Sequence, residues 1–372
     1  MRVFILTLGT RGDFELFCTL GRELRRRRHD VVLGTSHFYA DATEAAGLQW
    51  RPVGNGTHGE LLAVLRSAGD SGDRLRRTQL YVSGWLRPQL QSAQAQIGQG
   101  GERSDYFISN LKIALERGGD VLPGAFVTYD PPDAIESLTR YGSGTYGGRV
   151  LELVAMNRRL VDPEGRWGSA FKFTGFWSDP SRREWLPPAE LAAFLDGGPP
   201  PVVMTLGSMV TFDADRLTQD FAHALSIAGE RGILISGWAG LTSTAKRLLT
   251  LKEADYDWLF ARAACVVHHG GVGTLAAVLR AGKPSIVLPQ ILSQAQVGQM
   301  LLRENLAAGM FEASHLEPGE LAAAIHRAVD DDEMSESALR WQAAVLAEGG
   351  VQTAVDLIEQ HAEHLALPRA KL

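Results

Sequence analysis

The stretch Cys265–Leu279, CVVHHGGVGTLAAVL, contains residue types that can hold an anion. An apolar run leads into His268 and His269, and Gly271 and Gly273 then begin a G-x-G-x-x-A spacing. A strand that ends in a glycine-rich turn before a helix directs free backbone N–H groups, and the positive end of the helix dipole, at one point. We therefore expect this turn to bind phosphate.

A dinucleotide site is one interpretation of this spacing, but it also requires an acidic residue about 20 positions further on to bind the ribose. The segment 288–292 reads LPQIL and has no charge. The paired histidines can instead add a side-chain donor to the backbone N–H groups. The pattern favours a polyphosphate ligand without the second half of a nicotinamide site.

Length and composition limit the elements that can position this turn. A chain of 372 residues with 45% hydrophobic and 22% charged residues predicts two globular domains and hence a cleft. A net charge of −6 argues against a general nucleic-acid binder. Cys18 and Cys265 predict neither a disulfide framework nor a metal site, and they fit a reducing cytoplasm. We expect no signal peptide and no integral membrane segment.

The order of elements predicts parallel α/β sheets. A strand at 3–8, a helix at 15–28 and a strand at 31–34 form a βαβ opening. The proline-rich stretch 185–201 then suits a connection between domains. Directly after it, VVMTLGSM repeats the pattern of VFILTLGTRG near the N-terminus, which predicts two similar α/β domains.

Several motifs together resemble the two-domain glycosyltransferases of the GT-B fold that modify antibiotics, sterols and other small molecules. They are LGTRGD near the N-terminus and, in the second half, PPVVMTLGSM, ISGWAGL, DWLFARAACVVHHGGVGT and LRAGKPSIVLPQ. The likeness covers the first fifty residues and about 165–330, and it is poor over about 55–160. It implies two Rossmann-like, doubly wound domains that face a central cleft.

The resemblance also assigns ligands to these domains. It implies an acceptor-binding domain over 1–178, a linker over 179–201 and a nucleotide-sugar-binding domain over 202–350, with a C-terminal helix, 351–372, that returns toward the N-terminal domain. The expected donor is a UDP- or TDP-sugar and the expected acceptor is a small molecule. The protein is expected to be a monomer or homodimer that binds no nucleic acid and needs no cofactor or metal.

For the donor diphosphate, the resemblance selects His268, the Thr274 hydroxyl and backbone N–H groups of Gly271, Val272, Gly273 and Thr274. Donors of this kind stabilise the charge that a departing nucleoside diphosphate gains in the transition state. His269 stays open between ligand contact and packing, because neighbouring residues at a strand end point to opposite faces.

Two further residues in the second half are assigned by the same resemblance. Ser208 in GSM can reach the diphosphate, or it can be a simple turn serine. Trp238 in SGWAG corresponds to a segment near the nucleoside, and a buried core tryptophan is the alternative.

Asp13 in GTRGD is the candidate general base. In the resembling enzymes this aspartate faces the cleft, and an inverting transfer needs a base within hydrogen-bond reach of the acceptor hydroxyl. The alternative is that Asp13 caps a helix that begins at about Phe14, and both roles can coexist.

The sequence departs from the family's pattern at the donor sugar. After Pro289 and Gln290, the family usually has Asp-Gln to contact sugar hydroxyls, whereas this chain has Ser293 and Gln294. The missing carboxylate favours a deoxygenated or unusual sugar, or loss of activity.

Two D-x-D patterns, Asp213 with Asp215 and Asp255 with Asp257, could hold a metal. The first is better explained as a helix N-cap followed by a first-turn acid, and the second is the weaker candidate.

The favoured function is an inverting, metal-independent glycosyltransferase that modifies a natural-product acceptor. The alternatives are a catalytically inactive sugar-nucleotide binder or partner subunit, and a nucleotide-sugar epimerase of the same fold. We expect the acceptor to contact the first domain, where five aromatic residues could line an apolar cleft or belong to the core: Trp85, Phe107, Tyr129, Tyr141 and Tyr146.

Overall fold

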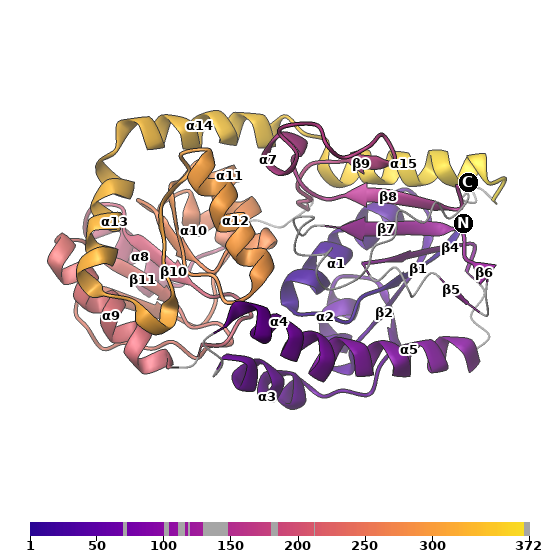
Figure 1. The fold of residues 1–372 in the computed structure, drawn as a ribbon, viewed down its shortest axis with the longest axis horizontal. Coiled ribbons are helices and arrows are strands. Elements are labelled where there is room, and N and C mark those ends of the chain that lie inside the picture. The colour runs from indigo at the N-terminus through magenta and orange to yellow at the C-terminus, as the bar shows by residue number, and fades with distance from the viewer. Residues whose placement is uncertain are drawn as a thin grey trace. The chain divides into compact units, whose positions relative to one another are not determined.

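The computed structural model describes residues 1–69, 73–99, 104–110, 116–117, 120–128, 148–179, 185–211 and 213–367. The chain forms two compact units. The first unit comprises Met1–Val64, Leu80–Ser181 and Glu348–Leu372, and the second comprises Leu65–Gln79 and Arg182–Ala347. Each unit is built on a parallel sheet (Figure 1), as the sequence predicted.

The sheet of the first unit has seven strands in the order β3-β2-β1-β4-β7-β8-β9. All its pairings are parallel, so the carboxyl ends of the strands share one edge. The apolar β1 and β4 are buried because helices cover both faces of such a sheet. The bounds are β1 Arg2–Leu6, β2 Asp30–Thr35, β3 Gln49–Pro52, β4 Tyr106–Ser109, β7 Gly124–Thr128, β8 Val150–Val154 and β9 Phe171–Phe173; β5 Glu116–Arg117 and β6 Asp120–Val121 form a separate antiparallel pair.

The first helix of the first unit begins four residues earlier than the sequence predicted. The helix α1 begins at Arg11, because Thr10 and Asp13 form a capping box at its N-terminus. Its buried stripe includes Phe14 and Phe17. The other helices are η1 His37–Tyr39, α2 Ala40–Ala45, α3 His58–Gly69, the π-helix η2 Val82–Leu86, α5 Arg87–Gln99, α7 Arg158–Val161 and α15 Gly350–His364.

The sheet of the second unit has six parallel strands in the order β12-β11-β10-β13-β14-β15. Four of them, β10, β11, β13 and β14, are wholly buried. The strands are β10 Val202–Thr205, β11 Gly232–Ile235, β12 Leu248–Leu251, β13 Val266–His268, β14 Ser285–Val287 and β15 Ala307–Met310. The helices are α8 Ala189–Asp196, α9 Ala214–Ala228, α10 Tyr256–Phe260, α11 Val272–Ala281, α12 Leu292–Arg303, η4 Ala313–His315, α13 Pro318–Asp330 and α14 Asp332–Leu346.

Two segments lie in units that their place in the sequence does not suggest. Residues 65–79, which contain the end of α3 and most of α4 (Arg74–Tyr81), belong to the second unit although they fall in the first quarter of the chain. Residues 179–201, expected as a linker, contain α8, whose Leu191 is fully buried in the core of the second unit. The part of the chain that the structure describes contains no helix long and apolar enough to cross a membrane.

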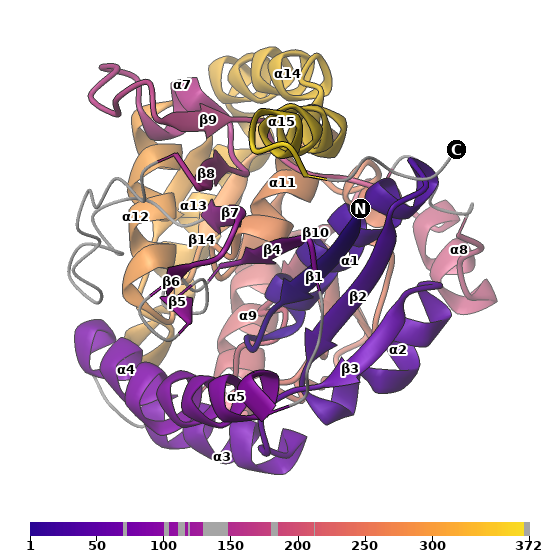
Figure 2. The same ribbon diagram turned by 90° about the vertical axis from the view of Figure 1, so that its right-hand side faces the viewer.

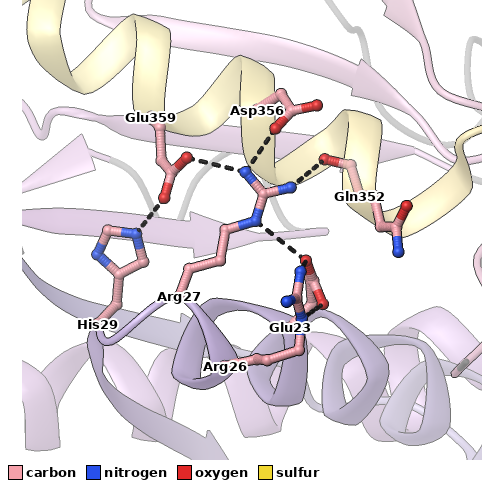
Figure 3. A network of polar contacts seen from close by, with 7 residues as sticks. All are labelled: Glu23, Arg26, Arg27, His29, Gln352, Asp356 and Glu359. Atoms are coloured by element: carbon pink, nitrogen blue, oxygen red, sulfur yellow. Dashed lines mark hydrogen bonds and ion pairs between the residues drawn. The ribbon is translucent and has the colours of Figure 1, made fainter. Parts of the chain in front are cut away.

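The C-terminal helix α15 packs on α1 and β8 of the first unit (Figures 1 and 2). Figure 3 shows the polar network that fixes it. Arg27, just after α1, donates to Glu23 at 3.0 Å, to Asp356 at 2.5 Å and to Glu359 at 3.0 Å, and Glu359 also contacts His29 at 2.8 Å. One guanidinium thus joins the first helix of the chain to the last.

We expect Arg27→Met to lower the free energy of unfolding of the purified protein by about 1–3 kcal/mol, the range for lost hydrogen bonds to charged groups. Loss of the half-buried Arg27 side chain would leave the buried carboxylate of Glu23 with one hydrogen-bond donor fewer. Chemical denaturation measures the change. Arg25→Met on the exposed side of the same helix is the matched control, and equal stability of the two variants would contradict the proposed coupling.

Candidate active site

The turns after β10, β11, β13 and β14 meet at the carboxyl edge of the second unit's sheet, because all these strands are parallel. In sheets of this kind, ligands bind outside the carboxyl ends of the strands. The predicted donor-binding residues of the second unit lie at the end of β13, on these turns or on the helices that follow them. The fold therefore brings together one group of residues that the sequence spread over almost 90 positions.

Glycines allow two of these turns to touch. A Cβ atom on Gly237 would lie 2.4 Å from the backbone oxygen of Gly207, and both residues have positive φ, at +54° and +57°. The same oxygen accepts a hydrogen bond from the backbone N–H of Trp238 at 3.2 Å. Larger residues at either glycine would force the turns after β10 and β11 apart.

His268 is the last residue of β13 and is fully buried. Its Nδ1 accepts a hydrogen bond from the Gly270 backbone at 3.1 Å, and its Nε2 has no hydrogen-bond partner among the described residues. Burial, with a smaller contribution from the charge of His269, lowers the pKa of His268 to about 3. The ring is therefore neutral at physiological pH.

The His269 ring lies against two of the converging turns. A Cβ atom on Gly271 would fall 2.2 Å from its Nε2, and one on Gly207 would fall 2.9 Å from its Cε1. Burial lowers the pKa of His269 to about 4, against a weaker opposing effect of a hydrogen bond to the Thr205 backbone. The His269 ring thus lies between Gly207 and Gly271. With these pKa values, both histidines can serve as neutral hydrogen-bonding groups but not as cations.

The glycine-rich turn ends in an open helix terminus. Gly271 is the N-cap of α11, a helix of 10 residues, and provides no capping side chain. The predicted diphosphate residues Val272, Gly273 and Thr274 form the first turn of this helix, and a Cβ atom on Gly273 would meet nothing within 4 Å. Backbone N–H groups at such a terminus bind anions.

Ser208 and Trp238 are both half-buried and lie on the turns joined at Gly207. The turn at Ser208 is supported by Thr205, whose hydroxyl accepts a hydrogen bond from the Gly207 backbone at 3.0 Å and bonds to the Tyr256 hydroxyl at 2.9 Å. Sequence reasoning missed this pair, and the only available signal was the position of Thr205 at the end of an apolar strand.

The predicted sugar-binding residues are the second and third residues of α12. The side-chain oxygen of Gln294 accepts hydrogen bonds from the backbones of Gln290, at 2.8 Å, and Ile291, at 3.3 Å. The acceptor atom of this amide is thus used inside the protein, and its NH₂ group is the part that can bind a ligand. Ser293 is partly exposed beside it.

Asp13 lies at the carboxyl end of β1 in the first unit, in the first turn of α1. Its Oδ2 accepts from the Thr10 backbone at 2.6 Å, and its Oδ1 accepts from the Asn110 side chain at 3.2 Å. Gly9 permits this placement, since a Cβ atom there would lie 2.1 Å from Oδ2. Thr10 is the N-cap, so Asp13 completes a capping box and does not cap the helix itself.

Burial raises the pKa of Asp13 to about 6, against the lowering effect of the hydrogen bonds from Thr10. A carboxyl group with a pKa in this range can both accept and release a proton near neutral pH. Sequence reasoning missed Asn110, which follows the distant strand β4; only the sheet order, with β4 beside β1, brings it to Asp13.

The first unit also has a pocket of about 720 Å³, whose size suits a small organic molecule. It lies at the carboxyl ends of β2 and β3, and its lining includes Phe38, Arg51 and His58. The remaining lining residues are His37, Pro52, Gly54, Asn55, Gly56, Thr57 and Gln96. None of these side chains is acidic.

Of the aromatic residues considered for the acceptor, Trp85 and Phe107 belong to the core. Trp85 is 1% exposed and Phe107 is 3% exposed, and the Trp85 indole N–H donates to the Leu8 carbonyl at 2.9 Å. Tyr129, Tyr141 and Tyr146 lie outside the described residues.

The two D-x-D patterns serve the helices that follow them. Asp213 and Asp255 accept hydrogen bonds from the Arg216 and Trp258 backbones as N-caps of α9 and α10. Asp257 pairs with Arg280 at 2.8 Å. Across the described ranges, no group of three or more metal-binding side chains comes together.

Comparisons with known proteins identify a family for this fold. Residues 3–80 match the glycosyltransferase family 28 N-terminal domain, and residues 256–360 match the C-terminal domain described as erythromycin biosynthesis protein CIII-like. The crystal structure of CalG4, the calicheamicin glycosyltransferase, superposes with a TM-score of 0.70 at 17% identity, covering 98% of this chain and 99% of CalG4.

Two curated relatives are similar over nearly the whole chain. The O-mycaminosyltylonolide 6-deoxyallosyltransferase of Streptomyces fradiae is 30% identical, over 98% of both chains. The sterol 3-beta-glucosyltransferase UGT80A2 of Arabidopsis thaliana is 24% identical, over 100% of this chain and 66% of that protein. This chain belongs to the GT-B glycosyltransferases of the group that contains the antibiotic and sterol enzymes.

Proposed function

We propose that the protein transfers a sugar from a UDP- or TDP-sugar to a hydroxyl group of a small natural-product or sterol-like acceptor, with inversion at the anomeric carbon and without a metal. The observation that carries this proposal is Asp13, a partly buried carboxyl group with a pKa of about 6 at the carboxyl edge of the first sheet. The family supplies the reaction class, and the names of the two relatives supply the acceptor classes.

In the proposed reaction, the acceptor hydroxyl gives its proton to the Asp13 carboxylate as its oxygen attacks the anomeric carbon. The bond from that carbon to the diphosphate breaks on the opposite face, and the charge passes to the diphosphate. Backbone N–H groups at the start of α11, with Thr274 and the two histidines, stabilise that charge by hydrogen bonds. We assign His269 to this group as well as His268, because its ring lies between Gly207 and Gly271.

The proposal of a metal-independent reaction is supported by the use of Asp213 and Asp255 as helix caps and of Asp257 in an ion pair. A helix terminus and neutral donors can take the place of a cation at a leaving diphosphate. This chain has Ser293 where the family usually has an aspartate, which supports a deoxygenated sugar. A sugar with fewer hydroxyl groups makes fewer hydrogen bonds to a carboxylate at this position.

We place the acceptor in the pocket at the carboxyl ends of β2 and β3. Phe38 in its wall packs on Tyr39, which in turn stacks on Phe14 at 4.3 Å, the residue next to Asp13. This row of aromatic rings leads from the pocket to the proposed base. Because no acidic side chain lines the pocket, it suits an uncharged or acidic acceptor of mainly apolar surface better than a cationic one.

The function is tested by binding and turnover of UDP- and TDP-sugars by wild type, Asp13→Asn and His269→Ala. We expect Asp13→Asn to bind the donor normally but to lose turnover by about 10²–10⁴-fold, the range for a general base. His269→Ala should weaken nucleoside diphosphate binding by about tenfold, as expected for loss of one hydrogen bond to a charged group. Donor binding without turnover by wild type on a broad acceptor panel would favour an inactive sugar-nucleotide binder.

The rate of transfer should depend on the ionisation of Asp13. Because the base must be deprotonated, we expect kcat/KM to rise with pH through a midpoint near 6. Asn110→Ala removes a donor to the carboxylate and thereby disfavours its charged form, so the midpoint should move to higher pH. A midpoint near 4 in wild type, or an unmoved midpoint in the variant, would show that the environment of Asp13 does not govern the reaction.

The acceptor assignment is tested by Phe38→Ala, which removes one half-buried wall of the pocket. We expect the KM for the acceptor to rise by about 5–30-fold, as for the loss of about 1–2 kcal/mol of apolar contact. Slow hydrolysis of the donor in the absence of acceptor is the internal control and should not change. An unchanged KM for the acceptor would place the acceptor elsewhere.

A further inference from the structure

The segment 288–294, which carries the proposed sugar-binding residues, is held by hydrogen bonds from several directions. The Leu288 backbone N–H donates to the His268 carbonyl at 2.8 Å, which ties the segment to the phosphate-binding turn. Gln294 accepts from Gln290 and Ile291. Gln294 also packs on Gly270, where a Cβ atom would lie 2.8 Å from the Gln294 backbone oxygen. Leu292, whose backbone N–H follows that of Ile291, is the first residue of α12.

The N-cap residue of α12 is Ile291, whose side chain has no polar atom. The partner of the Leu292 N–H is instead the Thr78 hydroxyl, at 3.2 Å, from a helix 214 residues earlier in the chain. Thr78 is 4% exposed, and its hydroxyl donates its own proton to the Arg74 carbonyl at 2.8 Å. That bond directs the oxygen lone pairs toward Leu292, so Thr78 supplies to α12 the cap that its own sequence lacks.

Two neighbouring residues of α4 hold this cap in place. Arg77 is 5% exposed and donates to the Gln290 carbonyl at 3.4 Å, and burial lowers the pKa of its guanidinium. Arg74 pairs with Glu312 at 2.5 Å. All three residues, with Glu312 and the whole of segment 288–294, belong to the second unit, and Figure 1 shows α4 beside the start of α12.

We propose that Thr78 is a positioning residue for the donor sugar: together with Arg77 it makes α4 a part of the sugar-binding site and fixes the directions of Ser293 and Gln294. This role rests on the proposed function, because it assumes that Ser293 and Gln294 contact the sugar. The cap acts directly on the segment, whereas the glycine-rich turn has further contacts of its own, from Gly270 to His268 and from Gly271 to His269. Loss of the cap therefore affects the sugar portion of the donor and spares the nucleoside diphosphate.

The experiment compares Thr78→Val, which keeps the shape but removes the hydroxyl, with Thr78→Ser, which keeps the hydroxyl. Hydrogen exchange of the ligand-free protein is measured first on peptides that cover 288–294 and 270–281. We expect exchange in 288–294 to quicken by about 2–10-fold in Thr78→Val, the change for one lost hydrogen bond, and to stay near wild type in Thr78→Ser. Equal exchange of 288–294 in wild type and Thr78→Val would contradict the proposal that Thr78 caps α12.

Binding is measured next with UDP, TDP, UDP-glucose and TDP-6-deoxyglucose, so that one of the two sugars is deoxygenated as proposed. We expect Thr78→Val to bind the sugar-free nucleotides as wild type does and to bind the matching sugar nucleotide about 3–10-fold more weakly, with recovery in Thr78→Ser. Equal loss for both kinds of ligand, or no loss, overturns the sugar role. If wild type binds none of the four, the proposed function fails and the sugar role fails with it, while the exchange result still decides the cap.

Discussion

The candidate donor site depends on the close approach of backbone turns at the carboxyl edge of the second sheet. The carbonyl oxygen of Gly207 is reached by the Trp238 N–H, and no side chain could occupy Gly237 beside it. Gly270 and Gly271 bring the next turn equally close to Gln294 and His269. A parallel sheet delivers its strand ends to this edge, but only glycine lets the turns come together there.

In both proposed sites, burial disfavours the charged forms of the titratable side chains. Burial keeps His268 and His269 neutral, with pKa values of about 3 and 4, and raises the pKa of Asp13 to about 6. In the proposed reaction, neutral donors at a helix terminus take the place of a fixed cation at the diphosphate. The same desolvation makes Asp13 a stronger base than an exposed aspartate, because its ionised form is less favoured.

Local patterns in the sequence predicted much of this. The apolar runs before TLGT, TLGS and HHGGVGT are strands, and the glycines after them are turns, because buried parallel strands and tight turns impose these residue types directly. The start of α1 was predicted four residues late, since TRGD could be interpreted as a turn until Thr10 and Asp13 were seen to bond to each other. Trp85 and Phe107 were considered for a ligand and lie in the core, because exposure depends on packing partners that are distant in sequence.

The sequence by itself determined the fold class, through the order of its apolar runs and turns, and it located the glycine-rich turn and Asp13, because each of these is encoded by residues close together in the chain. Only the tertiary structure decided which residues from distant parts of the chain contact these local features. Asn110 reaches Asp13 because β4 lies beside β1, and Thr78 caps α12 because α4 packs with the second unit. Contacts of this kind leave no local pattern, since one hydroxyl or amide among many is selected by the position of the helix or strand that carries it.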